Sequence, residues 1–217
     1  EALIDAILSG RDALCVMPTG GGKSLCYQIP ALLLPGITLV VSPLISLMKD
    51  QVAALKSAGI PAAYINSSLT GEQIRTVYAR TRKGAYKLIY VAPERLETNS
   101  FLSLMQEMDV SFLAVDEAHC ISQWGQDFRP SYLGIVDFIN ALPRRPIVAA
   151  YTATATKQVQ SDILRLLQMQ SPYRIVTGFD RPNLYFDVRR PKNKFSALAA
   201  LIDERRGRSG IVYCATR

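Results

Sequence analysis

Two short stretches of the chain carry residue types that suit phosphate chemistry. The first, MPTGGGKS at residues 17–24, follows the apolar run ALCVM. Successive glycines let backbone N–H groups turn inward around a phosphate, while the lysine and serine offer a cation and a hydroxyl for Mg²⁺. A helix that begins here also aims its positive end at the anion. The order of strand, glycine turn, GKS and helix predicts a nucleotide-binding P-loop.

The P-loop pattern has one departure. Its strict form has a glycine six residues before the lysine, where this chain has Met17. The alternative is a glycine turn followed by a chance Lys-Ser pair, but the strand and helix patterns on either side favour a P-loop. Lys23 is expected to reach the β- and γ-phosphates. The residues expected to bind ATP are Pro18, Thr19, Gly20, Gly21, Gly22, Lys23 and Ser24.

The second stretch, FLAVDEAH, ends an apolar strand pattern with two adjacent carboxylates, Asp116 and Glu117. The carboxyl ends of parallel strands meet at one edge, so both acids should face the loop that holds Lys23. There Asp116, with Ser24, is expected to hold Mg²⁺. Glu117 is expected to orient and deprotonate the water that attacks the γ-phosphate. The alternative is a solvated acidic turn.

Aromatic residues follow the acidic pair in a segment interrupted by a glycine and a proline, so we expect a loop. Trp124, Phe128 and Tyr132 could stack on bases of single-stranded DNA, with Arg129 as a cation. Such stacking contributes roughly 1–3 kcal/mol per base. They could equally form a small hydrophobic cluster that pins the loop to the body. The residues alone leave both readings open.

The elements that must position these residues form an alternating pattern. Strands are expected at 13–17, 37–42, 62–66, 87–91, 111–115 and 147–151. Helices are expected over 1–10, from the P-loop onward, and over 44–59, 70–84, 131–143 and 157–169. Most strand runs are apolar at consecutive positions, as in strands covered on both faces. We therefore predict an α/β fold with a doubly wound, mostly parallel sheet flanked by helices.

The pattern changes near the C-terminal end of the chain. Residues 179–194 carry prolines and many charges, so we interpret them as a linker after a first domain at 1–178. Residues 195–217 read as one helix and one strand, the truncated start of a second α/β unit. The chain has 217 residues and does not begin with Met, so we expect a segment excised from a longer protein.

Composition and charge bear on the kind of partner, the location and the metal content expected of this protein. The net charge is +7, and residues 179–217 hold nine basic against four acidic side chains, which favours polyanions. No apolar run is long enough for a membrane span, and the first residues do not resemble a signal peptide, so we expect an intracellular protein. The four cysteines form no CxxC pair, and there is one histidine. We expect free, buried thiols and no zinc in this segment.

Six stretches together resemble one family. MPTGGGKS, VVSPLISLMKDQ, APERL, DEAHCISQWGQDFRP, TATAT and FDRPN occur in this order. The chain resembles the RecQ family of superfamily 2 DNA helicases, of the DEAH-box type, over essentially its whole length. The resemblance implies an N-terminal RecA-like P-loop NTPase lobe plus the start of a second lobe. It further implies 3′-to-5′ translocation, unwinding of duplexes, and roles in DNA repair and recombination. Partners would be single-stranded and forked DNA, in the bacterial cytoplasm at the nucleoid or in a eukaryotic nucleus; protein partners stay open.

The resemblance also implies roles for residues that chemistry alone leaves open. His119 would couple hydrolysis to DNA binding, rather than being a satisfied structural histidine. Thr152 and Thr154 would link the ATP site to DNA, although an ordinary ST-turn that caps the next helix is also possible. Gln126 stands where the family usually has histidine. The residues implied in DNA binding or coupling are Trp124, Phe128, Arg129, Ser46, Lys49, Gln51, Thr152 and Thr154.

Parts expected of this family are outside the chain: the upstream adenine-recognition residues, the arginine finger, and the zinc-binding and winged-helix regions. We therefore expect this segment alone not to unwind DNA, and to bind nucleotide weakly. Two other classes stay open. One is a DNA-binding module with a vestigial ATPase, and the other is a P-loop phosphotransferase such as a nucleotide kinase.

Overall fold

The computed structural model describes residues 1–18, 20–177 and 184–214. The chain divides into two compact units, which we call the main unit (Glu1–Phe179) and the C-terminal unit (Asp180–Arg217). The six long-range strand pairings all lie in the main unit, and each is parallel. The candidate site residues named above all belong to the main unit.

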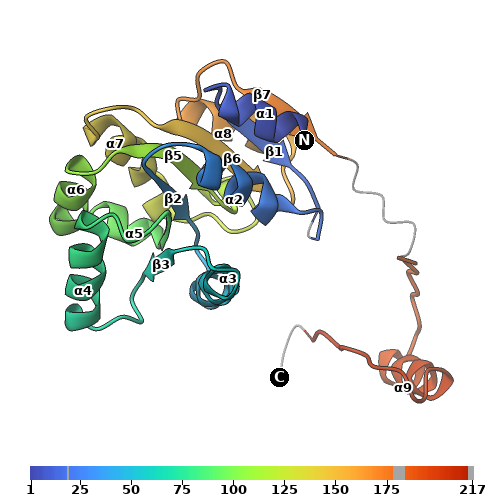
Figure 1. Cartoon of the computed structure of the whole chain (residues 1–217). Helices are drawn as coiled ribbons and strands as arrows, with labels where there is room; N and C mark the ends of the chain where they lie inside the picture. The colour runs from blue at the N-terminus through green and yellow to red at the C-terminus, as the bar shows by residue number, and fades with distance from the viewer. Residues whose placement is uncertain (19, 178–183, 215–217) are drawn as a thin grey trace. The chain divides into compact units, whose positions relative to one another are not determined.

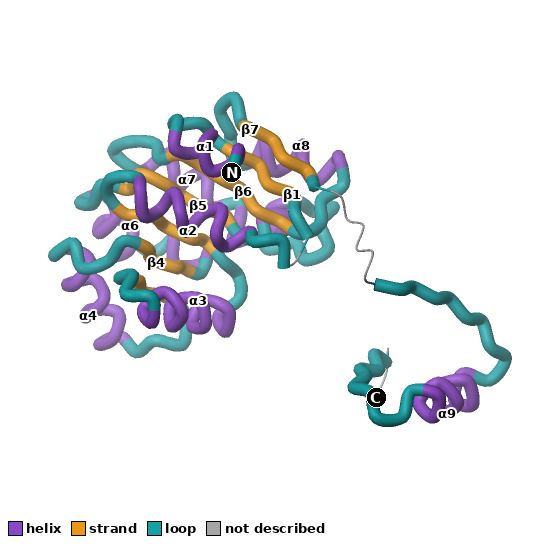
Figure 2. Tube along the Cα trace, turned by 45° about the vertical axis from the view of Figure 1, so that its right-hand side comes forward, coloured by secondary structure: helices purple, strands orange, loops and turns teal. Residues whose placement is uncertain are grey.

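A seven-stranded sheet forms the centre of the main unit, in the order β3-β4-β2-β5-β6-β1-β7 (Figures 1 and 2). Its strands are β1 (Ala13–Val16), β2 (Ile37–Val41), β3 (Ala62–Ile65), β4 (Leu88–Val91), β5 (Val110–Val115), β6 (Ile147–Thr152) and β7 (Tyr173–Val176). The six predicted strands are all present within a residue or two, and the predicted doubly wound parallel fold is confirmed.

Helices cover both faces of the sheet. They are α1 (Ala2–Leu8), α2 (Lys23–Leu33), α3 (Ile45–Ser57), α4 (Gly71–Arg82), α5 (Pro93–Leu96), α6 (Asn99–Gln106), α7 (Gly134–Ala141) and α8 (Lys157–Leu166), with the 3₁₀ turns η1 (Ala118–Ile121) and η2 (Pro130–Tyr132). The long predicted helices are confirmed, while the short α5 and α6 were not predicted.

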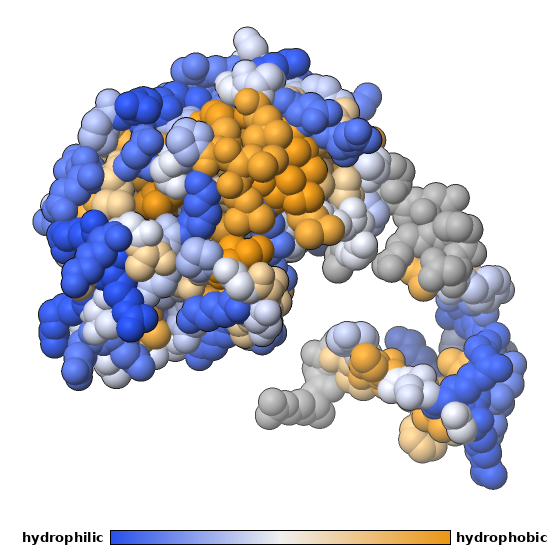
Figure 3. All heavy atoms as spheres, viewed as in Figure 1, coloured by the Kyte–Doolittle hydropathy of each residue, from blue (hydrophilic) through white to orange (hydrophobic). Residues whose placement is uncertain are grey.

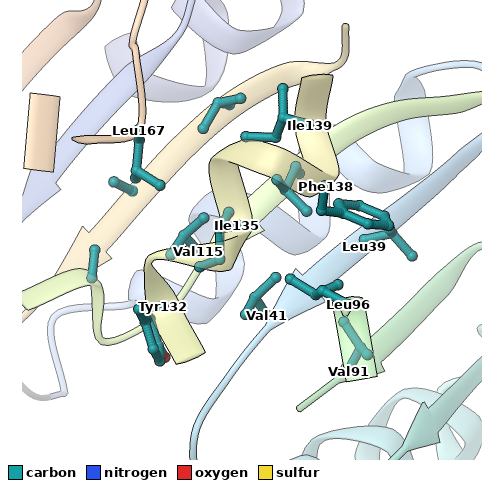
Figure 4. Packing of buried hydrophobic residues seen from close by; sticks show 14 of the residues in the cluster. Leu39, Val41, Val91, Leu96, Val115, Tyr132, Ile135, Phe138, Ile139 and Leu167 are labelled. Atoms are coloured by element: carbon teal, nitrogen blue, oxygen red, sulfur yellow. The ribbon is translucent and has the colours of Figure 1, made fainter. Parts of the chain in front are cut away.

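Two hydrophobic cores result, one on each face. Successive residues of a strand point to opposite faces, so Cys15 of β1 packs with α1, α2 and α3, and Val16 packs on the other side. That other core includes residues of α4, α6, α7 and α8, and Figure 4 shows Phe138 of α7 beside the strand residue Leu39, and Ile135 of α7 beside Val115. Burial on both faces explains why the strand runs are apolar without alternation.

Local signals set several helix ends as predicted. Thr70 and Gln73 form a reciprocal capping box at the start of α4, with N–H···O distances of 3.2 and 2.8 Å. Gly59 follows α3 with φ at +76°, the left-handed conformation expected of a helix-ending glycine. The turns after α3 and before α4 are therefore encoded locally.

The edge strand β7 was not predicted. Its burial alternates between half-buried and exposed residues, and its sequence, YRIV, places a charged residue inside an apolar run of only four. Pairing with β1 in parallel register makes it a strand. This is a case in which tertiary pairing overrides a weak local signal.

The C-terminal unit differs from expectation in one respect. Its helix α9 (Lys194–Glu204) is present, capped by Asn193, whose side chain accepts the Ser196 N–H at 3.1 Å. The strand expected near its end is wrong within the described residues: 211–214 have no strand partner, and Tyr213 is exposed. A strand needs a neighbour to satisfy its backbone groups, and residues 184–214 contain no strand that could serve as one. The predicted domain and linker boundaries stay a prediction.

The main unit also exposes apolar side chains. Figure 3 shows them gathered over α1 and α2. The exposed large residues on these helices are Leu8, Leu25, Ile29, Leu32 and Leu33. Two of the four cysteines, Cys15 and Cys120, are buried free thiols as predicted, while Cys214 is exposed.

A buried carboxylate connects the amino-terminal ends of several strands of the sheet. Asp12, only 2% exposed, accepts both guanidinium N–H groups of Arg145, at 3.1 and 2.7 Å. It also accepts the backbone N–H groups of Val148 and Gln170, at 2.9 and 2.6 Å. One side chain thus links the start of β1 to the start of β6 and to the turn before β7.

We expect Asp12→Ala to lower the free energy of unfolding by on the order of 3 kcal/mol, because it leaves the buried Val148 N–H, the partly buried Gln170 N–H and a partly buried guanidinium without their acceptor. Urea unfolding followed by circular dichroism measures this. The control is Arg144→Ala, which removes an exposed ion pair with Asp109 at 3.4 Å and should cost less than about 1 kcal/mol. Equal losses in the two variants would contradict the account of Asp12.

Candidate functional site

The predicted chemical residues meet at the carboxyl edge of three adjacent strands, β5, β6 and β1 (Figure 1). The glycine loop follows β1, the DEAH residues follow β5, and the TATAT residues end β6. Parallel strands in this order must deliver all three segments to one edge of the sheet. The topology therefore brings together segments that are far apart in the sequence.

The glycine loop has the backbone that a phosphate cradle needs. Gly20 and Gly22 have φ of +83° and +87°, which favour glycine, and α2 begins directly afterwards at Lys23. A Cβ at Gly21 would come within 2.6 Å of the Met17 side chain, so a larger residue at this position would require the Met17 side chain to shift. The Lys23 ammonium donates to the Met17 carbonyl oxygen at 3.2 Å, which closes the loop on itself. Thr19, also predicted here, lies outside the described residues.

Asp116 is a buried carboxylate, 6% exposed, directly after β5. It accepts the Glu117 N–H at 3.0 Å, and its own carbonyl accepts the Tyr132 hydroxyl at 2.9 Å. Burial first, and then the neighbouring Glu117 charge, raise the Asp116 pKa to about 6, while the Glu117 N–H and the Lys23 charge act in the opposite direction. A buried acid held beside a second acid is a site that favours a cation.

Glu117 adopts a left-handed backbone, with φ of 46° and ψ of 44°. This conformation is uncommon for a residue with a side chain and costs roughly 1 kcal/mol. It breaks the alternation of the strand and begins the 3₁₀ turn η1, which holds His119. The Glu117 carboxylate lies 3.4 Å from His119 Nδ1. The strained turn therefore brings the second acid and the histidine together.

His119 connects the acid pair to the end of β6. Its Nδ1 lies 2.9 Å from the hydroxyl of Thr152, which is fully buried. The Thr152 hydroxyl donates to the Thr154 carbonyl at 3.1 Å and accepts the Thr154 N–H at 3.3 Å. A proton on Nδ1 lets His119 donate toward Thr152 and face Glu117 at once. The ST-turn and the link to the acidic pair are both present.

The aromatic loop divides into an exposed part and a buried part. Trp124 is 76% exposed, and Phe128 is half-buried. Tyr132 is fully buried and its hydroxyl donates to the Asp116 carbonyl, so of the two readings left open it fits the one in which the aromatic residues pin the loop to the body. Arg129 forms an ion pair with Asp127 at 2.7 Å and donates to the Pro43 carbonyl at 3.4 Å. The cation thus lies at the loop, between Asp127 and the segment before α3.

Helix α3 presents the other predicted contacts in two ways. Ser46 and Lys49 are exposed. Gln51 instead accepts the Gln28 side-chain N–H at 2.8 Å, and Gln28 also donates to the Tyr90 hydroxyl at 3.2 Å. Gln51 is therefore held by α2, whereas Ser46 and Lys49 face outward.

Sequence reasoning missed residues that shape the aromatic loop. A Cβ at Gly125 would overlap the His119 carbonyl oxygen, so only glycine allows this close approach. Ser122 is fully buried and bonds to Asp162 of α8 at 2.7 Å. The glycine inside an otherwise aromatic and polar segment was a usable signal, but a serine and an aspartate 40 residues apart carried none.

Comparison with known proteins shows which family this chain belongs to. The family model described as DEAD/DEAH box helicase matches residues 1–162. The chain belongs to the DEAD/DEAH box helicase family. It is 51% identical over 207 residues to the ATP-dependent DNA helicase RecQ of Bacillus subtilis, covering 95% of this chain and 35% of that protein. It is 49% identical over 217 residues to the ATP-dependent DNA helicase RecQ of Pasteurella multocida, covering 100% and 34%. The resemblance to RecQ helicases is thereby confirmed.

This helicase-family chain spans about a third of the length of these curated relatives. Among solved structures, the DUF1998 helicase MrfA aligns over 100% of this chain and 35% of that chain, with a TM-score of 0.71 and 19% identity. The Hef helicase domain of Pyrococcus furiosus aligns over 80% and 38%, with a TM-score of 0.61 and 20% identity. At such identities these two structures support the fold alone.

In the part of the chain that the structure describes, no group of three or more His, Cys, Asp or Glu side chains is placed to hold a metal ion. A divalent ion at Asp116 would therefore need ligands from a nucleotide and from water. Within the same residues, no helix has the length and apolar character needed to cross a membrane.

We expect Asp116→Asn to raise the free energy of unfolding at pH 7.5, without nucleotide or Mg²⁺, by on the order of 1–3 kcal/mol. The carboxyl pKa is about 6 in the folded protein against 3.8 as its ordinary value, so the folded state binds this proton more tightly. The penalty of the ionised acid is present above pH 6 and disappears as the pH falls toward 4, where the two proteins should converge. Denaturant unfolding at pH 7.5, 6 and 4.5 measures this; a constant difference would contradict it.

Proposed function

We propose that this chain is the ATP-binding lobe of an ATP-dependent DNA helicase that moves 3′ to 5′ along single-stranded DNA. The observation that carries the proposal is the contact between His119 and Thr152, at 2.9 Å, beside the Glu117 carboxylate. It joins the acid that would act on water to the end of a neighbouring strand. The exposed Trp124 lies in the same segment, five residues after His119. Hydrolysis and DNA contact are therefore adjacent in one piece of chain.

In this proposal the glycine loop binds the phosphates of ATP. The backbone N–H groups of Gly20 and of residues 22–24 would face the anion, the Lys23 ammonium would exchange the Met17 carbonyl for phosphate oxygens, and α2 would add its positive end. Asp116 and Ser24 would hold Mg²⁺, which neutralises charge on the β- and γ-phosphates. The raised pKa of the buried Asp116 carboxyl supports this, because a buried acid beside another acid is stabilised by a nearby cation.

In this proposal Glu117 acts on the attacking water, and His119 couples it to the threonines at the end of β6. Glu117, partly exposed next to the loop, orients the attacking water and accepts its proton. The Nδ1 atom of His119 faces both the Glu117 carboxylate and the Thr152 hydroxyl, so a shift at Thr152 or Thr154 would be transmitted to Glu117. These threonines and His119 are the coupling residues of the proposal.

DNA would contact an exposed surface that begins at the aromatic loop. Trp124 offers a ring for a base, and Phe128 and Arg129 line the loop beside it. On α3, Ser46 and Lys49 are exposed and suit the phosphate backbone, with Gln51 positioned by Gln28. We propose single-stranded and forked DNA as the substrates, bound at the nucleoid or in a nucleus.

The whole protein is needed for unwinding in this proposal. We propose residues 1–178 as the first lobe, 179–194 as a linker and 195–217 as the beginning of a second lobe. The RecQ proteins of Bacillus subtilis and Pasteurella multocida are about three times as long as the matched region. A single lobe can hold ATP at one edge of its sheet, but translocation requires two bodies that move relative to each other.

The test is ATP turnover of the full-length protein with and without single-stranded DNA. We expect turnover to rise at least tenfold with DNA in the wild type and to be lost in Lys23→Ala, which removes a phosphate contact. Trp124→Ala should reduce the ratio of turnover with DNA to turnover without it, whereas Trp124→Phe, which keeps a ring, should retain most of it.

Other outcomes identify the rival classes. Turnover that ignores DNA would contradict the helicase proposal. Phosphate transfer to an acceptor other than water would indicate a phosphotransferase, and DNA binding without turnover would indicate a vestigial ATPase. Strand displacement on duplexes with a single 3′ tail or a single 5′ tail, assayed with the full-length protein, then tests the direction of movement: 3′-to-5′ movement requires the 3′ tail.

A further inference from the structure

The loop that carries Trp124 is fixed to the body at its base by one buried serine. Ser122 is fully buried, and its hydroxyl donates to the Asp162 carboxylate at 2.7 Å. The same hydroxyl accepts the backbone N–H of Trp124 at 3.2 Å. The Ser122 carbonyl accepts the Gly125 N–H at 2.9 Å. A single residue therefore sets the backbone on both sides of the exposed tryptophan.

The partner of this serine belongs to the helix that follows the TATAT segment. Asp162 lies in α8 and is 7% exposed, with one carboxylate oxygen on Ser122 and the other on Arg165 at 3.1 Å. The Ser122 hydrogen bond first, and then Arg165, lower the Asp162 pKa, so the acceptor is ionised at neutral pH. The Arg165 side chain is 70% exposed and forms its ion pair with Asp162 of the same helix.

Between the loop tip and the start of α8 there is a hollow instead of direct packing. It has a volume of about 380 Å³ and is lined by Trp124, Gly125 and Gln126 on one side and by residues 154–156 and Val159 on the other. The tip is therefore separated from α8 where Trp124 would meet DNA. The polar connection between the loop and α8 lies instead at its base, through Ser122 and Asp162.

These contacts connect the segment that holds His119 to α8 by two separate routes. On one side, His119 reaches Thr152 by its ring, and the chain runs from there through Thr156 into α8. On the other side, the Ser122 N–H donates to the His119 carbonyl at 3.2 Å, and the Ser122 hydroxyl reaches Asp162 of α8. A displacement of the loop relative to α8 must therefore act on both ends of the His119–Thr152 contact.

We propose that Asp162, through Ser122, is a positioning residue that transmits contact at Trp124 to the His119–Thr152 pair. Single-stranded DNA that occupies the tip shifts the loop, and the buried hydrogen bond makes α8 and the threonines before it follow. The inference rests on the proposed function, because it assigns a role in stimulation by DNA. Neither residue touches nucleotide or DNA in this account.

The test compares Asp162→Ala with Asp162→Asn, in the full-length protein. Alanine removes the acceptor, so we expect stimulation of ATP turnover by DNA to fall about tenfold while turnover without DNA stays within about twofold. Asparagine retains an oxygen for the Ser122 hydroxyl and should restore most of the stimulation. Arg165→Ala is the matched control, because it removes the other Asp162 partner without touching the loop, and it should leave stimulation intact.

Trp124 emission gives a readout that does not depend on turnover. The chain has one tryptophan, and subtracting the spectrum of Trp124→Phe isolates its signal in the full-length protein. We expect the DNA-induced change in this emission to persist in Asp162→Ala, since base contact remains, while stimulation is lost. This separation of DNA contact from stimulation is not expected if Asp162 only stabilises the fold.

Each outcome decides between the two claims. If the wild type shows no stimulation by DNA, the proposed function fails before this inference is tested. If the wild type is stimulated and Asp162→Ala is equally stimulated, the inference is overturned. Loss of turnover without DNA, or loss of the emission change, would show a merely structural role and would also overturn it. If Asp162→Ala does not fold, by circular dichroism, Ser122→Ala takes its place with the same expected results.

Discussion

The structure depends on one constraint: when helices cover both faces of a parallel sheet, the ends of its strands are the places left for a binding site. Every strand of the main unit is paired in parallel, so every connection that leaves a carboxyl end emerges on one side. Because β5, β6 and β1 are neighbours, the acid pair, the threonines and the glycine loop lie at the same end of the sheet. The opposite edge carries the buried Asp12 network, whose role is stability.

Two residues of the site adopt states that are unfavourable by themselves. Asp116 is buried, which raises the pKa of its carboxyl group, and Glu117 has a left-handed backbone. Tyr132 offsets part of this by donating its buried hydroxyl to the Asp116 carbonyl, which fixes the end of β5 from below. A neutral, relaxed strand end would be more stable, but it would offer neither a cation site nor a carboxylate turned toward His119.

Much of the fold could be predicted because its signals are local. Consecutive apolar residues indicated the six central strands, and Thr70 with Gln73 set the start of α4. The edge strand β7 could not be predicted, because pairing with β1 creates it, and neither could the failure of residues 211–214 to pair. For the site, spacing predicted which residues meet, but not how. The burial of Tyr132 and the bond between Ser122 and Asp162 depend on contacts between distant segments.

The central claim is that the His119–Thr152 contact couples DNA to hydrolysis, and a double-mutant cycle tests it most directly. Stimulation of ATP turnover by DNA would be measured in the full-length wild type, His119→Ala, Thr152→Val and the double variant. Valine keeps the shape of Thr152 and removes its hydroxyl. If the two side chains act through one hydrogen bond, each single variant loses stimulation and the double variant loses no more than the greater of them. Losses that multiply in the double variant would mean independent roles, and would contradict the account.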